Sequence, residues 1–125
     1  MKRTAVSEVF IGTDLVEVDR VRSSIEKSGD RFLDRIFTKT EQKYCQSKAN
    51  PDIHFAGRFA AKEAIIKALK SAGVKDPIPF SAIDVQPSES GEPIVVLEGD
   101  WEGKCKVSIS HTDKHAIASA IFILK

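Results

Sequence analysis

The chain is 125 residues long, with 42% hydrophobic and 30% charged residues. Its 19 Lys and Arg against 18 Asp and Glu give a formal net charge of +1. This length and balance predict one soluble globular domain over residues 1–125, and they give no global reason to expect binding to nucleic acid or to a membrane.

The cysteines and the amino-terminal stretch indicate the compartment. Cys45 and Cys105 lie far apart, without the spacing of a disulfide framework or a zinc site. Glu8 and Asp14 interrupt the apolar run that a secretory signal needs. The sequence also lacks the run of about 18 apolar residues that spans a bilayer. We therefore expect a protein of the reducing cytoplasm.

One strand and one or two helices are predicted at the start of the chain. The apolar stretch that ends at Gly12 predicts a strand, in which the glycine allows a bend or a close approach. Asp14 is then expected at the strand end. Between about residues 18 and 36, apolar side chains recur at helical spacing with an interruption at Gly29, so one helix or two short ones are expected.

Two further helices are predicted in the middle of the chain. Thr38 followed by Glu41 is a capping-box pattern, which predicts a helix start. A break at Pro51 precedes the stretch FAGRFAAKEAIIKAL, residues 55–69, which predicts a helix packed against a core and running to about Lys70.

The second half of the chain is predicted to form strands. VKDPIPF holds two prolines and is expected to be a loop, after which IDVQP and PIVVLEG are β-rich runs joined by SESGE. VSIS alternates, and HAIASAIFIL after the HTDK turn predicts the other strand of a second hairpin. Helices early and strands late predict an α+β fold with an antiparallel sheet packed with helices.

Charged residues interrupt the apolar helix at 55–69. Each residue turns a helix by about 100°, so Glu63, Lys67 and Lys70 share one face, and Lys62 is expected beside it as part of one polar patch. One interpretation is a solvated face with a Glu–Lys pair at i and i+4, worth about 0.2–0.5 kcal/mol. The other is a patch that binds a ligand, and the helix alone does not decide between them.

Asp14 offers a second carboxylate, placed just after a glycine. One interpretation is that it caps the following helix. If its strand packs against the helix at 55–69, however, Asp14 and Glu63 can share a Mg²⁺ ion. This ion needs only one or two protein carboxylates and takes its other ligands from water and phosphate.

The stretch VSISH places His111 at the end of a strand that has Ser108 and Ser110 on one side. A histidine at such a position is either a structural hydrogen bonder or a donor to a bound phosphate. His54 and His115 have weaker claims to a functional role.

Taken in order, five stretches resemble the holo-acyl-carrier-protein synthases, a small bacterial family of the 4′-phosphopantetheinyl transferase superfamily. They are IGTDLVEVDRV, DRFLDRIFTKTE, FAGRFAAKEAIIKAL, ESGEP, and VSISHT followed by an alanine-rich apolar strand. Each is weak alone, but the ordered set covers nearly the whole chain and is highly specific. The resemblance implies the transferase fold, assembled as a trimer with coenzyme A in clefts between neighbouring subunits.

The resemblance also implies a Mg²⁺-dependent transferase of fatty acid biosynthesis. Members of the family transfer the 4′-phosphopantetheine group of coenzyme A to a serine of apo-acyl carrier protein and release adenosine 3′,5′-bisphosphate. The nucleophile arrives with the carrier protein, so the sequence needs no serine or cysteine nucleophile motif. The acceptor of the serine proton stays open between an ordered water and Glu63 acting through water. A non-catalytic homologue that only binds carrier protein or coenzyme A is the alternative. A third hypothesis is an unrelated Mg²⁺-dependent nucleotide hydrolase, but the sequence has no GxxxxGK(S/T) loop to support it.

Individual roles follow from the same resemblance. Asp14 and Glu63 match the metal-binding acids, and the residues that match catalytic positions are Glu63, Lys67 and His111. The coenzyme A site is implied to comprise Lys62, Lys67, Lys70, Ser71, Gly91, Pro93 and His111. The helix after Asp14 matches the carrier-protein-binding face through Arg20, Lys27 and Arg31, for which ordinary solvated charge is the alternative.

Two departures from the family pattern affect the implied coenzyme A site. After the central helix the family has Ala-Leu-Gly-Thr-Gly, whereas this chain has ALKSAG at residues 68–73. Lys70 and Ser71 can supply a charge and a hydroxyl where glycines are lost. Glu92 stands between Gly91 and Pro93 where the family has a lysine, so that contact is not carried over, although the turn can survive.

Overall fold

A computed structural model describes residues 8–124. In chain order the elements are β1 (Glu8–Glu17), α1 (Val18–Ser28), α2 (Asp30–Ile36), α3 (Lys39–Gln46), α4 (Pro51–Ser71), the 3₁₀ turn η1 (Phe80–Ala82), β2 (Ile83–Gln86), β3 (Ile94–Leu97), β4 (Gly103–His111) and β5 (His115–Leu124). The predicted α+β class is confirmed, and so is the assignment of the last apolar run to a strand.

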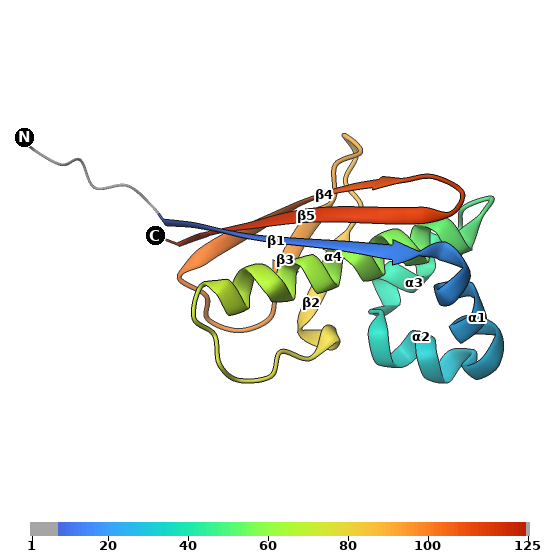
Figure 1. The fold of residues 1–125 in the computed structure, drawn as a ribbon, viewed down its shortest axis with the longest axis horizontal. Coiled ribbons are helices and arrows are strands. Elements are labelled where there is room, and N and C mark those ends of the chain that lie inside the picture. Colours follow the sequence, from blue (N-terminus) through green and yellow to red (C-terminus); the bar gives the residue numbers. More distant parts are fainter. Residues whose placement is uncertain (1–7, 125) are drawn as a thin grey trace, which may run out of the picture.

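The strands form two antiparallel sheets rather than one. β5 lies between β1 and β4 in a three-stranded sheet, and β2 pairs with β3 in a separate two-stranded sheet. Figure 1 shows α4 running along one face of the three-stranded sheet, with α1, α2 and α3 gathered at the end where β1 finishes. The helix that was expected to carry the charged patch therefore lies at the centre of the fold.

Helix α4 is buried around most of its circumference because small side chains line it. Ala60, Ala61, Ala64 and Ala68 have no exposed surface, and they let the helix backbone approach the sheet closely. A helix that is apolar nearly all round is typical of a protein core. Among the helices of residues 8–124, none is long and apolar enough to cross a membrane.

β1 and α4 approach each other at Gly12, so the close approach, and not the bend, is the alternative that occurs at this glycine. A Cβ atom on Gly12 would lie 1.9 Å from the carbonyl oxygen of Ala64 and 2.7 Å from the amide nitrogen of Ala68. Both are backbone atoms, so no change of rotamer relieves the clash. Gly12 therefore sets the distance between the strand that carries Asp14 and the helix that carries Glu63.

We expect Gly12→Ala to lower the free energy of unfolding by about 3 kcal/mol or more, at the upper end of the usual cost of overpacking a core. Urea denaturation measures this. The matched control is Gly57→Ala. Its Cβ would meet only the side-chain Cγ2 of Ile109 at 3.0 Å, and alanine is more favourable than glycine inside a helix, so this variant should lose less stability than Gly12→Ala. Equal stability of Gly12→Ala and the wild type would contradict the proposed role of the close approach.

Strand β1 is longer than the sequence predicted. It continues past Asp14 to Glu17, and Asp14 pairs with Ala118 of β5 instead of standing at the strand end. Exposure alternates along β1, so Asp14 shares with Gly12 the face that points toward α4. Helix α1 has Glu17 at its N-cap, and Asp14 is therefore not the cap of that helix.

The helices between residues 18 and 46 follow the predicted breaks. Gly29, at φ +51°, separates α1 from α2, so the two-helix alternative is the one that forms. The capping box at the start of α3 is also confirmed. Thr38 Oγ1 accepts the N–H of Glu41 at 3.1 Å, and Glu41 Oε1 accepts the N–H of Thr38 at 2.8 Å.

Candidate active site

Asp14 and Glu63 line one pocket, as the hypothesis of a shared cation requires. The pocket has a volume of about 380 Å³. Asp14 enters it from the helix-facing side of β1, and Glu63 enters it from α4. The two acids are distant in sequence, and the packing of Gly12 against α4 is what brings their elements together.

Lys67 supplies a positive charge beside the two acids. Its Nζ donates to Asp14 Oδ1 at 3.1 Å and to the carbonyl oxygen of Thr13 at 3.0 Å. The Asp14 side chain is 18% exposed and that of Lys67 is 54% exposed. Lys67 thus forms its ion pair with the neighbouring strand, not with Glu63 as on a solvated helix face.

The charges at the pocket leave Glu63 in an unfavourable environment for an ionised acid. Burial, and secondarily the negative charge of Asp14, raise the pKa of Glu63, while Lys67 opposes the shift. Asp14, Glu17 and Glu63 line the pocket against the positive charges of Arg20 and Lys67, so the negative charge exceeds the positive and favours binding of a further cation. Within residues 8–124 no group of three or more His, Cys, Asp or Glu side chains is arranged to hold a metal. An ion bound here would therefore take most of its ligands from water and phosphate, as Mg²⁺ does.

The remaining walls of the pocket are partly apolar and partly polar. Apolar side chains from α1, α2 and α4 face it, namely Val21, Phe32 and Phe59. Arg20 and Ser24 of α1 and Glu17 at the end of β1 add polar groups. Arg20, expected on the carrier-protein face, therefore also lines the pocket that holds the two acids.

The other two basic residues expected on the carrier-protein face lie farther along the same helical region. Lys27 is in the last turn of α1 and is exposed, and Arg31 is exposed in α2. Arg22, in contrast, is held by Asp19 and Asp52, so it ties α1 to the start of α4.

Lys62 does not join the polar patch, and its expected place beside Glu63 on that patch is wrong. Its side chain has no exposed surface, and its Nζ donates to Glu41 Oε1 at 2.6 Å. One residue along a helix turns the side chain by about 100°, and here that turn directs Lys62 toward α3 and the interior. Its ammonium is not available to a coenzyme A phosphate in this structure.

Lys70 and Ser71 lie at the end of α4. The Nζ of Lys70 donates to the carbonyl oxygens of Lys75 at 3.4 Å and Asp76 at 2.8 Å, so its charge is directed to the following loop. Ser71 is exposed as the last residue of the helix. Gly73, at φ +104°, keeps one glycine in the turn that departs from the family pattern.

The turn around Gly91 forms as expected. Gly91 adopts φ +99°, and its N–H donates to the carbonyl oxygen of Ser88 at 3.2 Å. Pro93 lines a pocket of about 460 Å³ together with Lys104 and Lys106 of β4. This pocket is separate from the one that holds Asp14 and Glu63.

His111 belongs to a separate cluster of basic and aromatic side chains. Its ring lies 5.5 Å from the ring of His54, which lies 5.9 Å from that of Tyr44. The guanidinium of Arg58 stacks 4.2 Å from the Tyr44 ring centre, and Lys48 Nζ is 4.7 Å from it. We call these five residues the His–Arg cluster. Within residues 8–124 of one chain, the pocket lined by Asp14 and Glu63 includes none of these five residues, and His111 lines a different pocket.

The His–Arg cluster has the character of an anion site. Arg58 is 7% exposed, and its Nε has no hydrogen-bond partner within the described part of the chain. Burial, and next the charge of His111, lower the pKa of His54. Sequence analysis missed Tyr44, Lys48 and Arg58. The i, i+4 spacing of His54 and Arg58 was the available signal, but it does not show that α3 and β4 complete the cluster.

Comparisons with known proteins agree with one another. The family model described as the 4′-phosphopantetheinyl transferase superfamily matches residues 10–120. A holo-[acyl-carrier-protein] synthase of Protochlamydia amoebophila is 39% identical over 117 residues, covering 90% of this chain and 95% of that protein. One of Koribacter versatilis is 42% identical over 118 residues, covering 88% and 94%. The crystal structure of the synthase from Bacillus anthracis in complex with CoA (3′,5′-ADP) has a TM-score of 0.78 and 32% identity, covering 97% of this chain and 100% of that one.

Proposed function

This chain belongs to the 4′-phosphopantetheinyl transferase superfamily, and we propose that it is a holo-acyl-carrier-protein synthase. It transfers the 4′-phosphopantetheine group of coenzyme A to a serine hydroxyl of apo-acyl carrier protein. The serine hydroxyl gives up its proton to water and its oxygen bonds to the phosphorus that carries pantetheine. The bond from that phosphorus to the bridging oxygen breaks, and adenosine 3′,5′-bisphosphate leaves with the electron pair on that oxygen. The observation that carries the proposal is the meeting of Asp14 and Glu63 in one pocket, with Lys67 bound to Asp14.

The acids of the pocket fit a hard divalent cation. Carboxylate oxygens are suitable ligands for Mg²⁺, and the raised pKa of Glu63, caused by burial and by Asp14, reflects negative charge that such an ion would offset. Asp14 and Glu63 would hold the ion. When bound, Mg²⁺ supplies Lewis-acid polarisation of phosphoryl oxygens.

The protein's own residues contribute alignment and charge. Phosphoryl transfer needs little covalent help, so positioning and the neutralisation of oxygen charge supply most of the rate enhancement. Lys67 is exposed enough to exchange its contact with Asp14 for a diphosphate oxygen. The apolar wall formed by Phe32 and Phe59 limits access of water to the buried side of the pocket.

The His–Arg cluster is proposed to bind anionic groups of coenzyme A. Arg58 is a nearly buried cation whose Nε lacks a hydrogen-bond partner among residues 8–124, and His111, the last residue of β4, lies beside His54 of the same cluster. A guanidinium matches the geometry of phosphate oxygens. This role includes the position of His111 that the family resemblance implied and adds Arg58 to it.

Carrier-protein recognition is proposed to use Arg20, Lys27 and Arg31. All three lie on the α1–α2 region, and Arg20 also lines the pocket of the two acids. Acyl carrier proteins are strongly acidic, so the attraction would speed association and weaken as salt is added. Such a surface would deliver the carrier serine next to Asp14 and Glu63.

We propose that the enzyme assembles as a homotrimer through the outer face of the three-stranded sheet. Ile11, Leu15 and Ile117 are 66%, 64% and 42% exposed on this face, and Leu15 pairs with Ile117 across β1 and β5. Exposed apolar surface of this kind is typical of protein interfaces. A cleft between subunits would let the His–Arg cluster of one chain and the acids of another contact the same coenzyme A.

We expect Ile11→Asp to convert a trimer into a monomer of 13.8 kDa, because a charge at the interface must be desolvated without a partner. Sedimentation velocity measures the mass of the particle, and transfer activity should fall when the trimer is lost. Ile94→Asp is the control, since Ile94 is 47% exposed on β3, outside this face. A monomeric wild type, or a trimeric Ile11→Asp, would refute the assembly.

The cytoplasm is the proposed site of action. Cys45 and Cys105 are buried free thiols. Burial raises the pKa of Cys45 to about 12 and that of Cys105 to about 11, so neither is a reactive thiolate. Two buried thiols that remain reduced fit a reducing compartment.

One assay tests the function directly. The protein is incubated with coenzyme A, Mg²⁺ and apo-acyl carrier protein, and the carrier is weighed by mass spectrometry. A carrier that gains the phosphopantetheine mass supports the transferase. Binding of carrier or coenzyme A without a mass change favours a non-catalytic homologue, and cleavage of coenzyme A without carrier favours a hydrolase.

A further inference from the structure

Lys62 and Glu63 are neighbours on α4 and point to different sides of the helix. Glu63 lines the pocket with Asp14, whereas Lys62 is fully buried and donates to Glu41 Oε1 at 2.6 Å. A buried lysine loses the hydration of its ammonium and needs a close partner. The Lys62–Glu41 ion pair therefore joins α4 to α3 only one residue away from Glu63, which lines the pocket.

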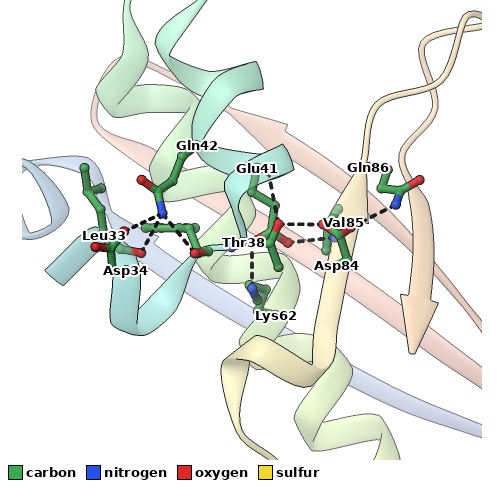
Figure 2. A network of polar contacts seen from close by, with 10 residues as sticks. Leu33, Asp34, Thr38, Glu41, Gln42, Lys62, Asp84, Val85 and Gln86 are labelled. Carbon is green, nitrogen blue, oxygen red and sulfur yellow. Dashed lines mark hydrogen bonds and ion pairs between the residues drawn. The ribbon is translucent and has the colours of Figure 1, made fainter. Parts of the chain in front are cut away.

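Glu41 is itself held from three directions. Its Oε1 accepts the backbone N–H of Thr38 at 2.8 Å as well as the Lys62 ammonium, and its Oε2 accepts the backbone N–H of Val85 at 2.7 Å. Figure 2 shows this carboxylate at the junction of α3, α4 and β2. A carboxylate with three charge-assisted hydrogen bonds has little freedom to move.

The surroundings of Glu41 are bonded in turn. Thr38 Oγ1 donates to Asp84 Oδ1 at 2.6 Å, and Gln86 Nε2 donates to Asp84 Oδ2 at 2.9 Å. These bonds tie the start of α3 to β2 independently of α4. The partner of Lys62 is thus fixed in place by elements other than the helix that Lys62 belongs to.

Helix α4 is consequently held at two points on its circumference. Gly12 of β1 contacts its backbone at Ala64 and Ala68, and the Lys62–Glu41 pair holds it toward α3 and β2. A rotation of the helix about its axis would break the ion pair and would displace Glu63 relative to Asp14. Active-site groups must be held to about 0.5 Å and 10–20° for full activity.

We propose that Glu41 and Lys62 are positioning residues, which set the rotation of α4 so that Glu63 and Lys67 face Asp14. This inference rests on the proposed function, because it concerns the geometry of that same pocket. It assigns Lys62 a task that does not require contact with coenzyme A. The proposal also distinguishes this ion pair from one that only stabilises the fold. A buried ion pair can often be replaced by neutral side chains without loss of stability, so a positioning role and a stabilising role can be measured separately.

The test uses the double variant Glu41→Gln/Lys62→Met, which removes both charges and retains an acceptor oxygen for one backbone N–H. Single variants leave a buried charge unpaired and are expected to fold poorly, so they serve only as stability references. The double variant is compared with the wild type at a temperature where both are folded by circular dichroism. We expect kcat to fall by about 10- to 100-fold, since a misplacement of about 1 Å can cost that much.

Two readouts separate positioning from stability. Calorimetric titration of Mg²⁺ into protein saturated with coenzyme A should show binding at least about tenfold weaker in the double variant, with KM for carrier protein unchanged. A crystal structure of the variant should show Glu63 displaced relative to Asp14. The control is Ile83→Val, a fully buried residue of β2, which lowers stability without breaking the pair and should leave kcat and Mg²⁺ binding unchanged.

The possible outcomes are distinct. A folded double variant with wild-type kcat, Mg²⁺ affinity and Glu63 position overturns the positioning role and leaves the proposed function intact. Equal loss of kcat in Ile83→Val also overturns it, because stability alone would then explain the effect. A wild-type protein that transfers no phosphopantetheine overturns the proposed function, and the positioning role falls with it.

Discussion

Replacing Glu63 with glutamine, or Asp14 with asparagine, is expected to reduce phosphopantetheine transfer by roughly 10³-fold or more, since each removes a charged group aimed at the reacting phosphoryl oxygens. Both substitutions keep the size of the side chain, so packing around the pocket is preserved. Single-turnover assays followed by mass spectrometry of the carrier protein measure the loss. Full activity of either variant would remove the assignment of the two acids as a metal-binding pair.

Stability should not fall together with activity in Glu63→Gln. The folded protein raises the pKa of Glu63 through burial and the charge of Asp14. The contribution of the protonated Glu63 to the stability of the folded state is therefore fully present below the pKa of the unfolded state. It is lost as the pH rises through the pKa of the folded state. Glutamine avoids this loss at neutral pH, so the melting temperature should stay the same or rise. The control is Glu102→Gln, which removes an exposed acid and should change neither quantity.

Local patterns predicted the elements of this fold well. The capping box at Thr38 and the break at Gly29 each depend on a few neighbouring residues, and both occur in the structure. Gly12 predicted a bend or a close approach, and the structure has the close approach, to α4. The extent of β1 was less predictable. The apolar run that signalled the strand ends at Gly12, but pairing with β5 continues through Asp14 to Glu17, and pairing depends on a strand from the far end of the chain.

The errors at the site have a common physical cause. Helical periodicity gives the angle between the side chains of Lys62 and Glu63. It does not predict which of the two side chains is buried against other elements of the fold. Glu41 looked sufficient as half of a capping box, yet its carboxylate has capacity for further donors. Only tertiary packing shows that Lys62 and the N–H of Val85 use that capacity.

The sequence could predict that Asp14 and Glu63 act together because each had an independent signal. Asp14 follows a glycine in a predicted strand, and Glu63 is a charged residue in an otherwise apolar helix. The His–Arg cluster had no comparable signal. Tyr44, Arg58 and His111 come from α3, α4 and β4, and none of these elements indicates the other two. Their common location follows from the packing of α4 between the sheet and the helices.

Replacing Lys67 with methionine is the second change for which we expect a large effect. Its ammonium is bound to Asp14 at 3.1 Å, and its charge lowers the pKa of Glu63 against the effects of burial and of Asp14. Without it, Asp14, Glu17 and Glu63 line the pocket with less opposing charge. We expect transfer to fall by about 10²-fold, comparable to the loss of one preorganised donor at a developing oxyanion, and the pKa of Glu63 to rise further.

The pH dependence distinguishes Lys67→Met from a general loss of stability. Since the folded pKa of Glu63 rises further above its unfolded value, the variant should be less stable than the wild type at neutral pH and should recover as the pH falls through that pKa. Carbon-detected NMR of the Glu63 carboxyl group and melting temperatures across the acidic to neutral range measure the two effects.

Lys67→Arg keeps the charge and should leave the pKa of Glu63 near its wild-type value. Lys70→Met removes a lysine from the same helix whose ammonium contacts loop carbonyls, and it should not shift that pKa. If the pKa of Glu63 were the same in Lys67→Met and the wild type, Lys67 would not act on this pocket through its charge.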